Sequence, residues 1–143
     1  MKKLLGLSFA IFCFVSCSGD DDGAKTPAAD LSQLTKRWYN VSYIVSGQTV
    51  PYDGNPAGGC GKDYMQFAAN GVLSKSDITD CQTDAVVTSG TYTTSEAAGA
   101  TTVVTAIGGN TNSYTVVKLN ANELQLQRVN SNPVTIEVYT SNP

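Results

Sequence analysis

Apolar and polar residues alternate one by one toward the end of the chain. Leucine alternates with glutamate and glutamine over residues 123–127, and valine or isoleucine alternates with threonine and glutamate over 134–138. Successive side chains of a strand point to opposite faces of a sheet, so this period of two residues predicts half-buried antiparallel strands. The apolar side chains that the pattern turns toward the core are Leu124, Leu126, Val134, Ile136 and Val138.

Similar short runs, rich in valine, threonine and aromatic residues, recur from residue 37 onward. Asn and Gly stand between several of them and tolerate the positive φ that tight β-turns require. The only helix that we expect is a turn over residues 30–36, with Asp30 as its N-cap. The chain is thus divided into eight predicted strands: 37–45, 63–68, 71–76, 87–94, 101–107, 113–119, 123–129 and 134–140.

The earlier strands show their inner faces less clearly. Met65 and Phe67 mark the inner face of the second strand, and Tyr92 is expected in the core from the fourth. The first strand is ambiguous, because Trp38 and Ile44 lie on one of its faces while other large side chains lie on the opposite face. Those on the opposite face are Tyr39, Val41, Tyr43 and Val45.

Eight short strands joined in sequence order are expected to close into an up-and-down antiparallel barrel, because closure removes the exposed edges of a sheet. Such a barrel is either filled by its side chains or holds one small ligand. We therefore predict an all-β barrel domain at residues 31–143. The connection 47–61 is too long for a hairpin turn. Tyr52 and Asp53 are expected at its exposed tip, in a contact loop, a lid or a tolerated insertion.

The N-terminus carries a different pattern. Two lysines precede a continuous apolar run, which ends at Ser16 and is followed by Cys17. This is the layout of a secretory signal peptide, and the run is shorter than the roughly 20 residues that cross a bilayer. Phe14-Val15-Ser16-Cys17 resembles the lipobox of bacterial lipoproteins, in which cleavage precedes a cysteine that then carries a diacylglycerol. We expect a signal peptide at residues 1–16 and lipid attachment at Cys17, which makes the membrane a partner.

Residues 18–30 are small, charged or proline, so they cannot bury enough apolar surface to fold. With Cys17 they form a predicted lipidated, flexible and acidic tether, residues 17–30. Its first part, Ser18-Gly19-Asp20-Asp21-Asp22, resembles the acidic export signal of Bacteroidota surface lipoproteins. The same residues would also serve as a solubilising spacer. The expected location is the outer membrane, with cell-surface display favoured over its periplasmic face.

Charge and cysteine usage agree with an exported domain. The chain has 9 basic and 12 acidic residues and no basic run, so nucleic acid is not an expected partner. Removing Cys13 with the signal peptide and Cys17 with the lipid leaves Cys60 and Cys81. In an oxidising compartment this pair is most simply a disulfide. A redox or metal pair would need CxxC spacing or further His or Cys ligands, and the chain has no His.

No recognisable catalytic set accompanies the barrel pattern. A triad that uses His is impossible, and no glycine-rich phosphate loop opens a helix. Asp77, Asp80 and Asp84 lie near Cys81, but their spacing does not match an EF-hand loop. We therefore expect these acids to be solvated, and we expect no enzyme activity, cofactor or metal.

Several short motifs follow one another along the chain: Leu34-Thr35-Lys36-Arg37-Trp38 with Val41 after it, Cys60-x-x-Asp63-Tyr64-Met65-Gln66-Phe67-x-x-Asn70-Gly71, Cys81, Gly90-Thr91-Tyr92, Tyr114-Thr115-Val116, Leu119 and Asn122-Glu123-Leu124-Gln125-Leu126. In this order and spacing they resemble the lipocalin-like domain of Bacteroidota lipoproteins, over about residues 31–140. The resemblance implies that Trp38 packs across the closed end of the barrel, beneath an arginine from a late strand that Arg128 would supply. The alternative is that Trp38 forms part of a ligand-pocket wall.

The resemblance further implies that the barrel binds a small apolar or amphipathic molecule. The alternative hypothesis is a surface module that contacts a protein or a glycan through the 47–61 connection and holds no interior ligand. The two hypotheses differ in whether the interior contains a void on the order of a few hundred Å3. The residues expected to line such a cavity, or otherwise to form the core, are Trp38, Met65, Phe67, Tyr92, Leu124, Leu126, Ile136 and Val138.

Overall fold

The computed structural model describes residues 29–81 and 85–143. The signal peptide, Cys17 and most of the tether lie outside these ranges, as does Asp84. Within them, no helix is long and apolar enough to cross a membrane. The elements, in chain order, are η1 (Leu31–Gln33), β1 (Arg37–Val45), β2 (Gln48–Pro51), β3 (Tyr64–Phe67), β4 (Val72–Asp77), β5 (Val86–Ala97), β6 (Ala100–Ile107), β7 (Asn110–Leu119), β8 (Glu123–Arg128) and β9 (Thr135–Thr140).

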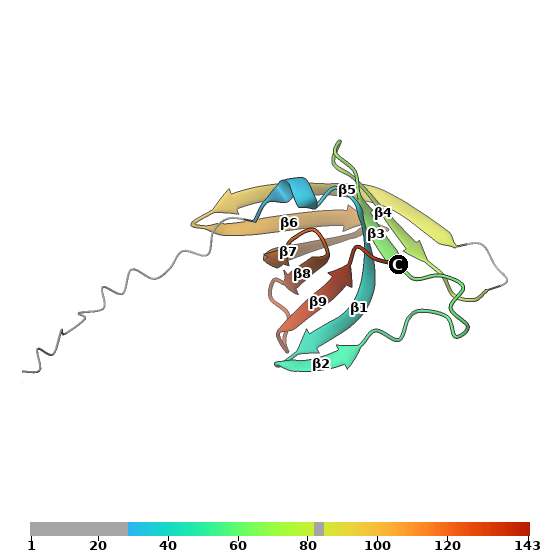
Figure 1. Cartoon of the computed structure of the whole chain (residues 1–143). Coiled ribbons are helices and arrows are strands. Elements are labelled where there is room, and N and C mark those ends of the chain that lie inside the picture. Colours follow the sequence, from blue (N-terminus) through green and yellow to red (C-terminus); the bar gives the residue numbers. More distant parts are fainter. Residues whose placement is uncertain (1–28, 82–84) are drawn as a thin grey trace, which may run out of the picture.

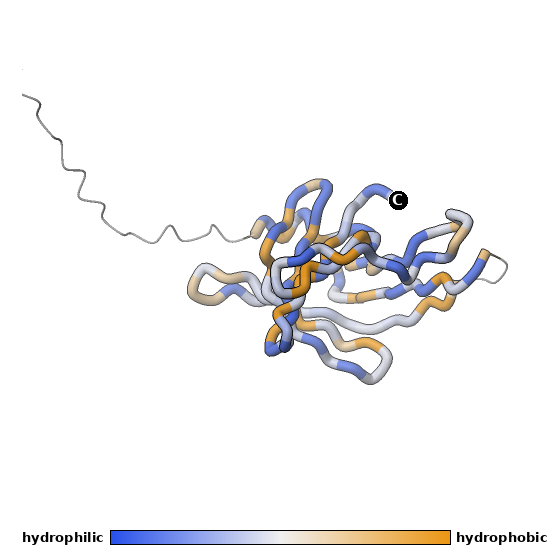
Figure 2. The backbone as a smooth tube through the Cα atoms, turned by 90° about the horizontal axis from the view of Figure 1, so that it is seen from below, coloured by the Kyte–Doolittle hydropathy of each residue, from blue (hydrophilic) through white to orange (hydrophobic). Residues whose placement is uncertain are grey.

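The sheet closes on itself as predicted. Each strand from β3 to β9 pairs antiparallel with its neighbour in the sequence, and β1 pairs with β3 on one edge and with β9 on the other. β1 and β3–β9 thus form the expected eight-stranded barrel (Figure 1). Buried and more exposed positions alternate along β8, so that one of its faces lies in the core. Hydrophobic and hydrophilic positions also alternate along much of the backbone (Figure 2).

A ninth strand, β2, corrects the prediction of an irregular connection over 47–61. It pairs with the end of β1, where Tyr43 lies opposite Val50, on the edge that β3 leaves uncovered. Ser46 and Gly47 both have positive φ, at 50° and 80°, which is the requirement of a type I′ hairpin turn. The Ser46-Gly47 dipeptide was therefore the sequence signal for this hairpin.

A β-bulge resolves the ambiguous pattern of β1. The register between β1 and β9 shifts between Asn40 and Ser42, which leaves Val41 as the extra residue. A bulge reverses the face that later side chains occupy. Trp38 therefore faces the interior before the bulge, and Tyr43 faces it afterwards, opposite Glu137.

The inner face of β9 is the opposite of the predicted one. Glu137 and Tyr139 are buried at 8% and 2% exposure, and they pair with the inward-facing Leu126 and Leu124 of β8. Cross-strand partners share a face of the sheet, which places the apolar alternate residues outside. These are Ile136 and Val138, both half-buried, while Val134, just before β9, is 52% exposed.

Large side chains fill the interior of the barrel from Leu34 and Trp38 at its closed end, near η1, to Tyr114 of β7. The buried residues of this core are Leu34, Trp38, Met65, Phe67, Leu73, Val103, Tyr114, Leu124, Leu126 and Tyr139.

Hydrogen bonds around η1 stabilise the closed end of the barrel. The side chain of Asp30 accepts from the Ser32 N–H, which confirms the predicted N-cap. The indole N–H of Trp38 donates to the Leu34 carbonyl at 2.9 Å. The cation beside the Trp38 ring is Lys36, whose Nζ lies 5.2 Å from the ring centroid. The expectation that Arg128 covers Trp38 is therefore wrong, because Arg128 lies at the other end of β8.

Gly90 allows β5 to approach β6 closely. A Cβ at this position would overlap the Ala106 carbonyl oxygen and lie 2.8 Å from the Ile107 Cβ. Both atoms belong to β6, whose backbone is held by its own ladder bonds to β5 and β7.

We predict that Gly90→Ala lowers the free energy of unfolding by about 1–3 kcal/mol, because the methyl group forces two paired strands apart. Thr91→Ala, at the exposed neighbouring position, should cost less than about 1 kcal/mol. Urea denaturation of both variants measures the difference. Equal losses would show that the close approach at Gly90 carries no packing constraint.

Candidate functional site

A cavity of about 410 Å3 lies at the end of the barrel opposite η1. The chain forms this end with the β1–β2 turn and the connection from β8 to β9 (Figure 1). The two are joined by a hydrogen bond from the Ser46 N–H to the Val134 carbonyl at 3.1 Å. We call this the open-end cavity; its lining residues are Tyr43, Arg128, Ser131, Asn132, Pro133, Thr135 and Glu137.

Strand pairing brings the main polar side chains of this cavity together. Tyr43 of β1 lies opposite Glu137 of β9, and Arg128 of β8 lies opposite Tyr114 of β7. The Arg128 guanidinium lies 5.9 Å from the centroid of the Tyr114 ring. Side chains from four strands that are consecutive around the barrel thus meet on its inner face.

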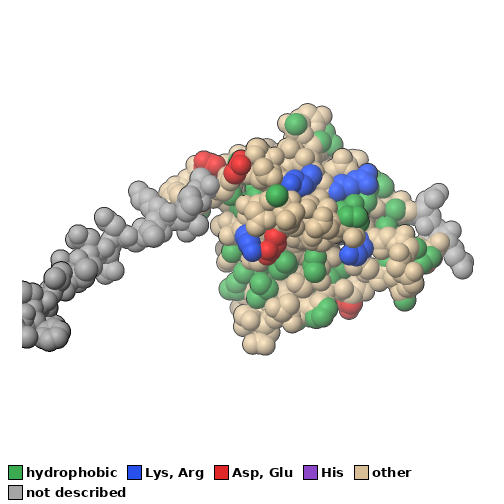
Figure 3. Space-filling view, viewed as in Figure 1, with side chains coloured by type: hydrophobic (Ala, Val, Ile, Leu, Met, Phe, Trp, Pro, Cys, Tyr) green, Lys and Arg blue, Asp and Glu red, His purple; other side chains and the backbone are tan. Residues whose placement is uncertain are grey.

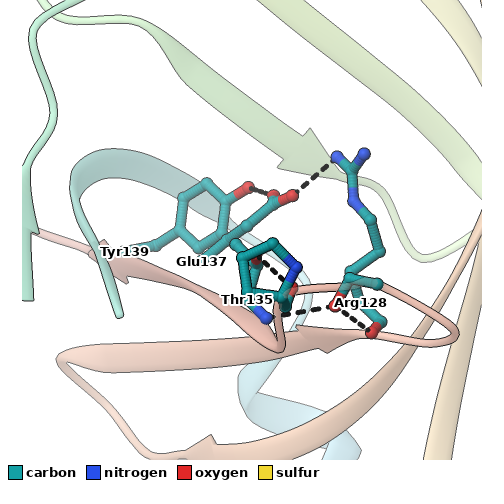
Figure 4. Close-up of polar contacts among 6 residues, drawn as sticks. Arg128, Thr135, Glu137 and Tyr139 are labelled. Carbon is teal, nitrogen blue, oxygen red and sulfur yellow. Dashed lines mark hydrogen bonds and ion pairs between the residues drawn. The ribbon is translucent and has the colours of Figure 1, made fainter. Parts of the chain in front are cut away.

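The buried carboxylate of Glu137 is the centre of this group. Its Oε1 accepts from Arg128 Nη2 at 2.9 Å, and its Oε2 accepts from the Tyr139 hydroxyl at 2.5 Å. Figure 4 shows the two donors converging on the carboxylate from opposite sides. A buried carboxylate is tolerated only when it is paired and hydrogen-bonded, and here both oxygens have a donor.

The environment keeps the surrounding tyrosines protonated. Burial and then the charge of Glu137 raise the pKa of Tyr114 to about 12, and the same causes raise the pKa of Tyr139 well above its ordinary value. The hydrogen bond to Glu137 raises the pKa of Arg128. At neutral pH the tyrosines are therefore neutral donors, and Arg128 is a full cation.

The connection over the cavity is held by Ser131. Its hydroxyl donates to the Arg128 carbonyl and accepts from the Thr135 N–H, both at 3.0 Å. One side chain thus links the end of β8 to the start of β9, which fixes the rim of the cavity (Figure 4).

The segment after β2 forms the neighbouring wall. The Tyr52 ring lies 5.8 Å from the Tyr43 ring, and its hydroxyl donates to Asp63. The other oxygen of Asp63 accepts from the Ile78 N–H at 2.7 Å. Tyr52 is therefore half-buried instead of lying at an exposed tip, whereas Asp53 is exposed as expected.

The predicted disulfide is confirmed between Cys60 and Cys81, 21 residues apart. It ties the connection before β3 to the segment after β4. Closing a loop of this length removes unfolded-state entropy equivalent to about 3 kcal/mol.

Of the eight residues predicted to line a cavity or to form the core, six lie in the core or against it. Five of them are buried in the core, and Tyr92 packs edge-on against Phe67 with its hydroxyl donating to the Ala68 carbonyl at 2.8 Å. Ile136 and Val138 occupy the outer face of the barrel. The open-end cavity contains none of these eight residues. The sequence pattern missed the true lining because Glu137 is one of the polar residues in an alternating strand and was therefore assigned to the outer face. Two features could have indicated the opposite face: Tyr139 lies on the same side of the strand as Glu137, and the alternation of β1 is interrupted.

Another cavity, of about 310 Å3, lies beside the β5–β6 turn near Ala29. Its charged lining residue, Lys118, is already bound to Glu123 at 2.6 Å, and the rest of the lining is uncharged. The open-end cavity is the stronger candidate because several polar groups converge on it.

Charged side chains elsewhere do not gather into a site. On the face shown in Figure 3, basic and acidic side chains lie in small separate groups among uncharged ones. Among the described residues, no three His, Cys, Asp or Glu side chains lie close enough to hold a metal ion.

The fold is a small, closed antiparallel barrel with a cavity at one end. Residues 34–126 match the family model of the lipocalin-like domain, and the chain belongs to that family. A lipocalin-like protein from Bacteroides uniformis ATCC 8492 has a similar crystal structure, with a TM-score of 0.56 and 13% sequence identity over 76% of this chain and 97% of the other. At that identity the likeness shows the fold alone. No curated protein matches the chain.

We predict that the Tyr139–Glu137 contact makes two substitutions non-additive. Glu137→Leu leaves the buried Tyr139 hydroxyl without its acceptor, which should cost about 1–3 kcal/mol of unfolding free energy. Adding Tyr139→Phe removes that donor, so the double variant should be no less stable than Glu137→Leu alone. Urea denaturation of both single variants and of the double variant gives the coupling free energy between Glu137 and Tyr139. Simple additivity would show that the contact contributes nothing.

Proposed function

We propose that this protein is a non-enzymatic binding protein, anchored to the outer membrane by lipid on Cys17, that holds a small amphipathic molecule in the open-end cavity. The proposal depends on one observation, the convergence of Tyr43, Arg128 and Glu137 on a space of about 410 Å3. Small-molecule sites typically measure about 300–1,000 Å3 and combine apolar walls with a few polar groups.

The lining favours an amphipathic ligand over a purely apolar one. The Arg128 side chain is 47% exposed, so its remaining N–H groups are hydrated when the cavity is empty of ligand. An apolar molecule would displace this water and offer no acceptor, at a cost of about 1–3 kcal/mol. The Tyr43 and Pro133 rings supply apolar surface for the rest of the ligand.

The point at which the N-terminal segment joins the barrel supports access of a ligand from solution to the open-end cavity. The Ala29 N–H donates to Thr101 Oγ1 at 3.3 Å, and η1 follows directly at the closed end. A lipid-bearing segment before Ala29 would therefore join the barrel away from the open-end cavity. The alternative of a contact loop without an interior ligand has less support, because Tyr52 is turned toward Tyr43 and Asp63.

Protein purified from its host should carry a bound small molecule that native mass spectrometry detects. Arg128→Met should reduce the occupied fraction at least about tenfold, because a hydrogen bond to a charged group contributes about 1.5–3 kcal/mol. Arg37→Met is the matched control: Arg37 also lies beside a tyrosine ring, 4.6 Å from that of Tyr64, but outside the cavity. Absence of any ligand, or equal loss in both variants, would contradict a site at Arg128.

The proposed anchor makes a separate prediction. Cells fed an alkyne-tagged fatty acid should label the wild-type protein and a Cys13→Ala variant, and the label should be lost in Cys17→Ala. Cys13 is the control because it lies four residues away, within the predicted signal peptide. Label in Cys17→Ala would exclude this anchor.

Protease treatment of intact cells tests the proposed surface display: a protein cut only after lysis faces the periplasm.

A further inference from the structure

The charges in the open-end cavity cancel. Arg128 and Glu137 are its charged lining residues, and their side chains meet at 2.9 Å. The cavity therefore offers neither a free cation nor a free anion to a ligand.

An anionic group meets an unfavourable field at this site. The pKa of Tyr43 is raised by burial and then by the negative charges of Glu137 and Asp53, with Asp63 adding to them, while Arg128 alone acts in the opposite sense. A ligand carboxylate that bonded to Arg128 would also lie close to the Glu137 carboxylate, and two like charges at such separations repel.

A cationic group is also disfavoured. Each oxygen of Glu137 already accepts one hydrogen bond, from Arg128 or from Tyr139, and the oxygens of Asp63 accept from Tyr52 and from the Ile78 N–H. An ammonium ion could use only the remaining lone pairs of Glu137, and the Arg128 cation beside that carboxylate would repel it.

Neutral hydrogen-bonding capacity remains available. Arg128 uses one terminal nitrogen for Glu137, and a guanidinium has five N–H donors in total. The Tyr43 hydroxyl and the Asn132 amide also line the cavity, and each can both donate and accept. The Tyr43 ring adds a flat apolar surface beside them.

We infer that the polar group of the ligand is an uncharged, hydroxyl-rich group, a sugar or a polyol. Adjacent hydroxyls both donate and accept, so they match the planar donors of Arg128 and Asn132, while the C–H face of a sugar ring packs on Tyr43. This inference rests on the proposed function and specifies its ligand. The same chemistry is present in a free saccharide and in the headgroup of a glycolipid.

Titration calorimetry on the full chain, in a detergent without sugar or charged groups, tests the ligand class. The probes are the methyl glycosides of glucose, galactose and mannose, methyl glucuronide, methyl glucosaminide, octyl glucoside, octanoate and octylamine. At least one neutral glycoside should bind about tenfold or more tightly than the glucuronide, the glucosaminide, octanoate and octylamine. Tighter binding of octyl than methyl glucoside indicates a glycolipid, and equal binding indicates a free saccharide.

Two variants connect the binding to the cavity. Arg128→Met should abolish glycoside binding, and Arg37→Met should preserve it. Glu137→Gln keeps an acceptor for Tyr139 but leaves Arg128 uncompensated, so the affinity for methyl glucuronide should rise at least about tenfold. Thermal unfolding curves establish that each variant is folded.

Failure of all neutral glycosides to bind overturns the inference, as does tighter, Arg128-dependent binding of octanoate or octylamine. In the second case the proposed function still stands with a different ligand. The proposed function itself fails only if the host-purified protein carries no molecule whose binding depends on Arg128.

Discussion

The closure of the sheet through β1 is the constraint on which the rest of the structure depends. β1 must pair with β3 at its start and with β9 along most of its length. The bulge at Val41 lets a single strand turn Trp38 into the closed end and Tyr43 into the open end. Without that change of face, the aromatic side chain at the open end would point to solvent and the barrel would lose one wall of its cavity.

The two ends of the barrel are stabilised in different ways. At the closed end the interior is filled with apolar side chains around Trp38, and burial of apolar surface provides the stability there. At the open end the interior is polar, and the Glu137 carboxylate is tolerated because Arg128 and Tyr139 both donate to it. Because the Arg128 side chain is 47% exposed, the ion pair contributes little net stability. At the cavity it orients donors without leaving a net charge.

The connection between β2 and β3 completes the open end from outside the closed barrel. Tyr52 packs on Tyr43, Asp63 collects hydrogen bonds from two directions, and the Cys60–Cys81 bond ties the connection to the segment after β4. These contacts hold the connection between β2 and β3 against the rim of the open-end cavity.

Local pattern was enough for the strand order, the closed barrel, the N-cap at Asp30 and the cysteine pair, because each depends on short-range periodicity, turn chemistry or a count of residues. It failed at β9, where the apolar alternate residues proved to be the outer ones. The face of a strand is chosen by its partners, and Glu137 is stable inside only because Arg128 and Tyr139 reach it. The sequence by itself therefore determined the barrel strands, whereas the tertiary structure alone decided which faces meet and where the open-end cavity lies, because both depend on contacts between residues far apart in the chain.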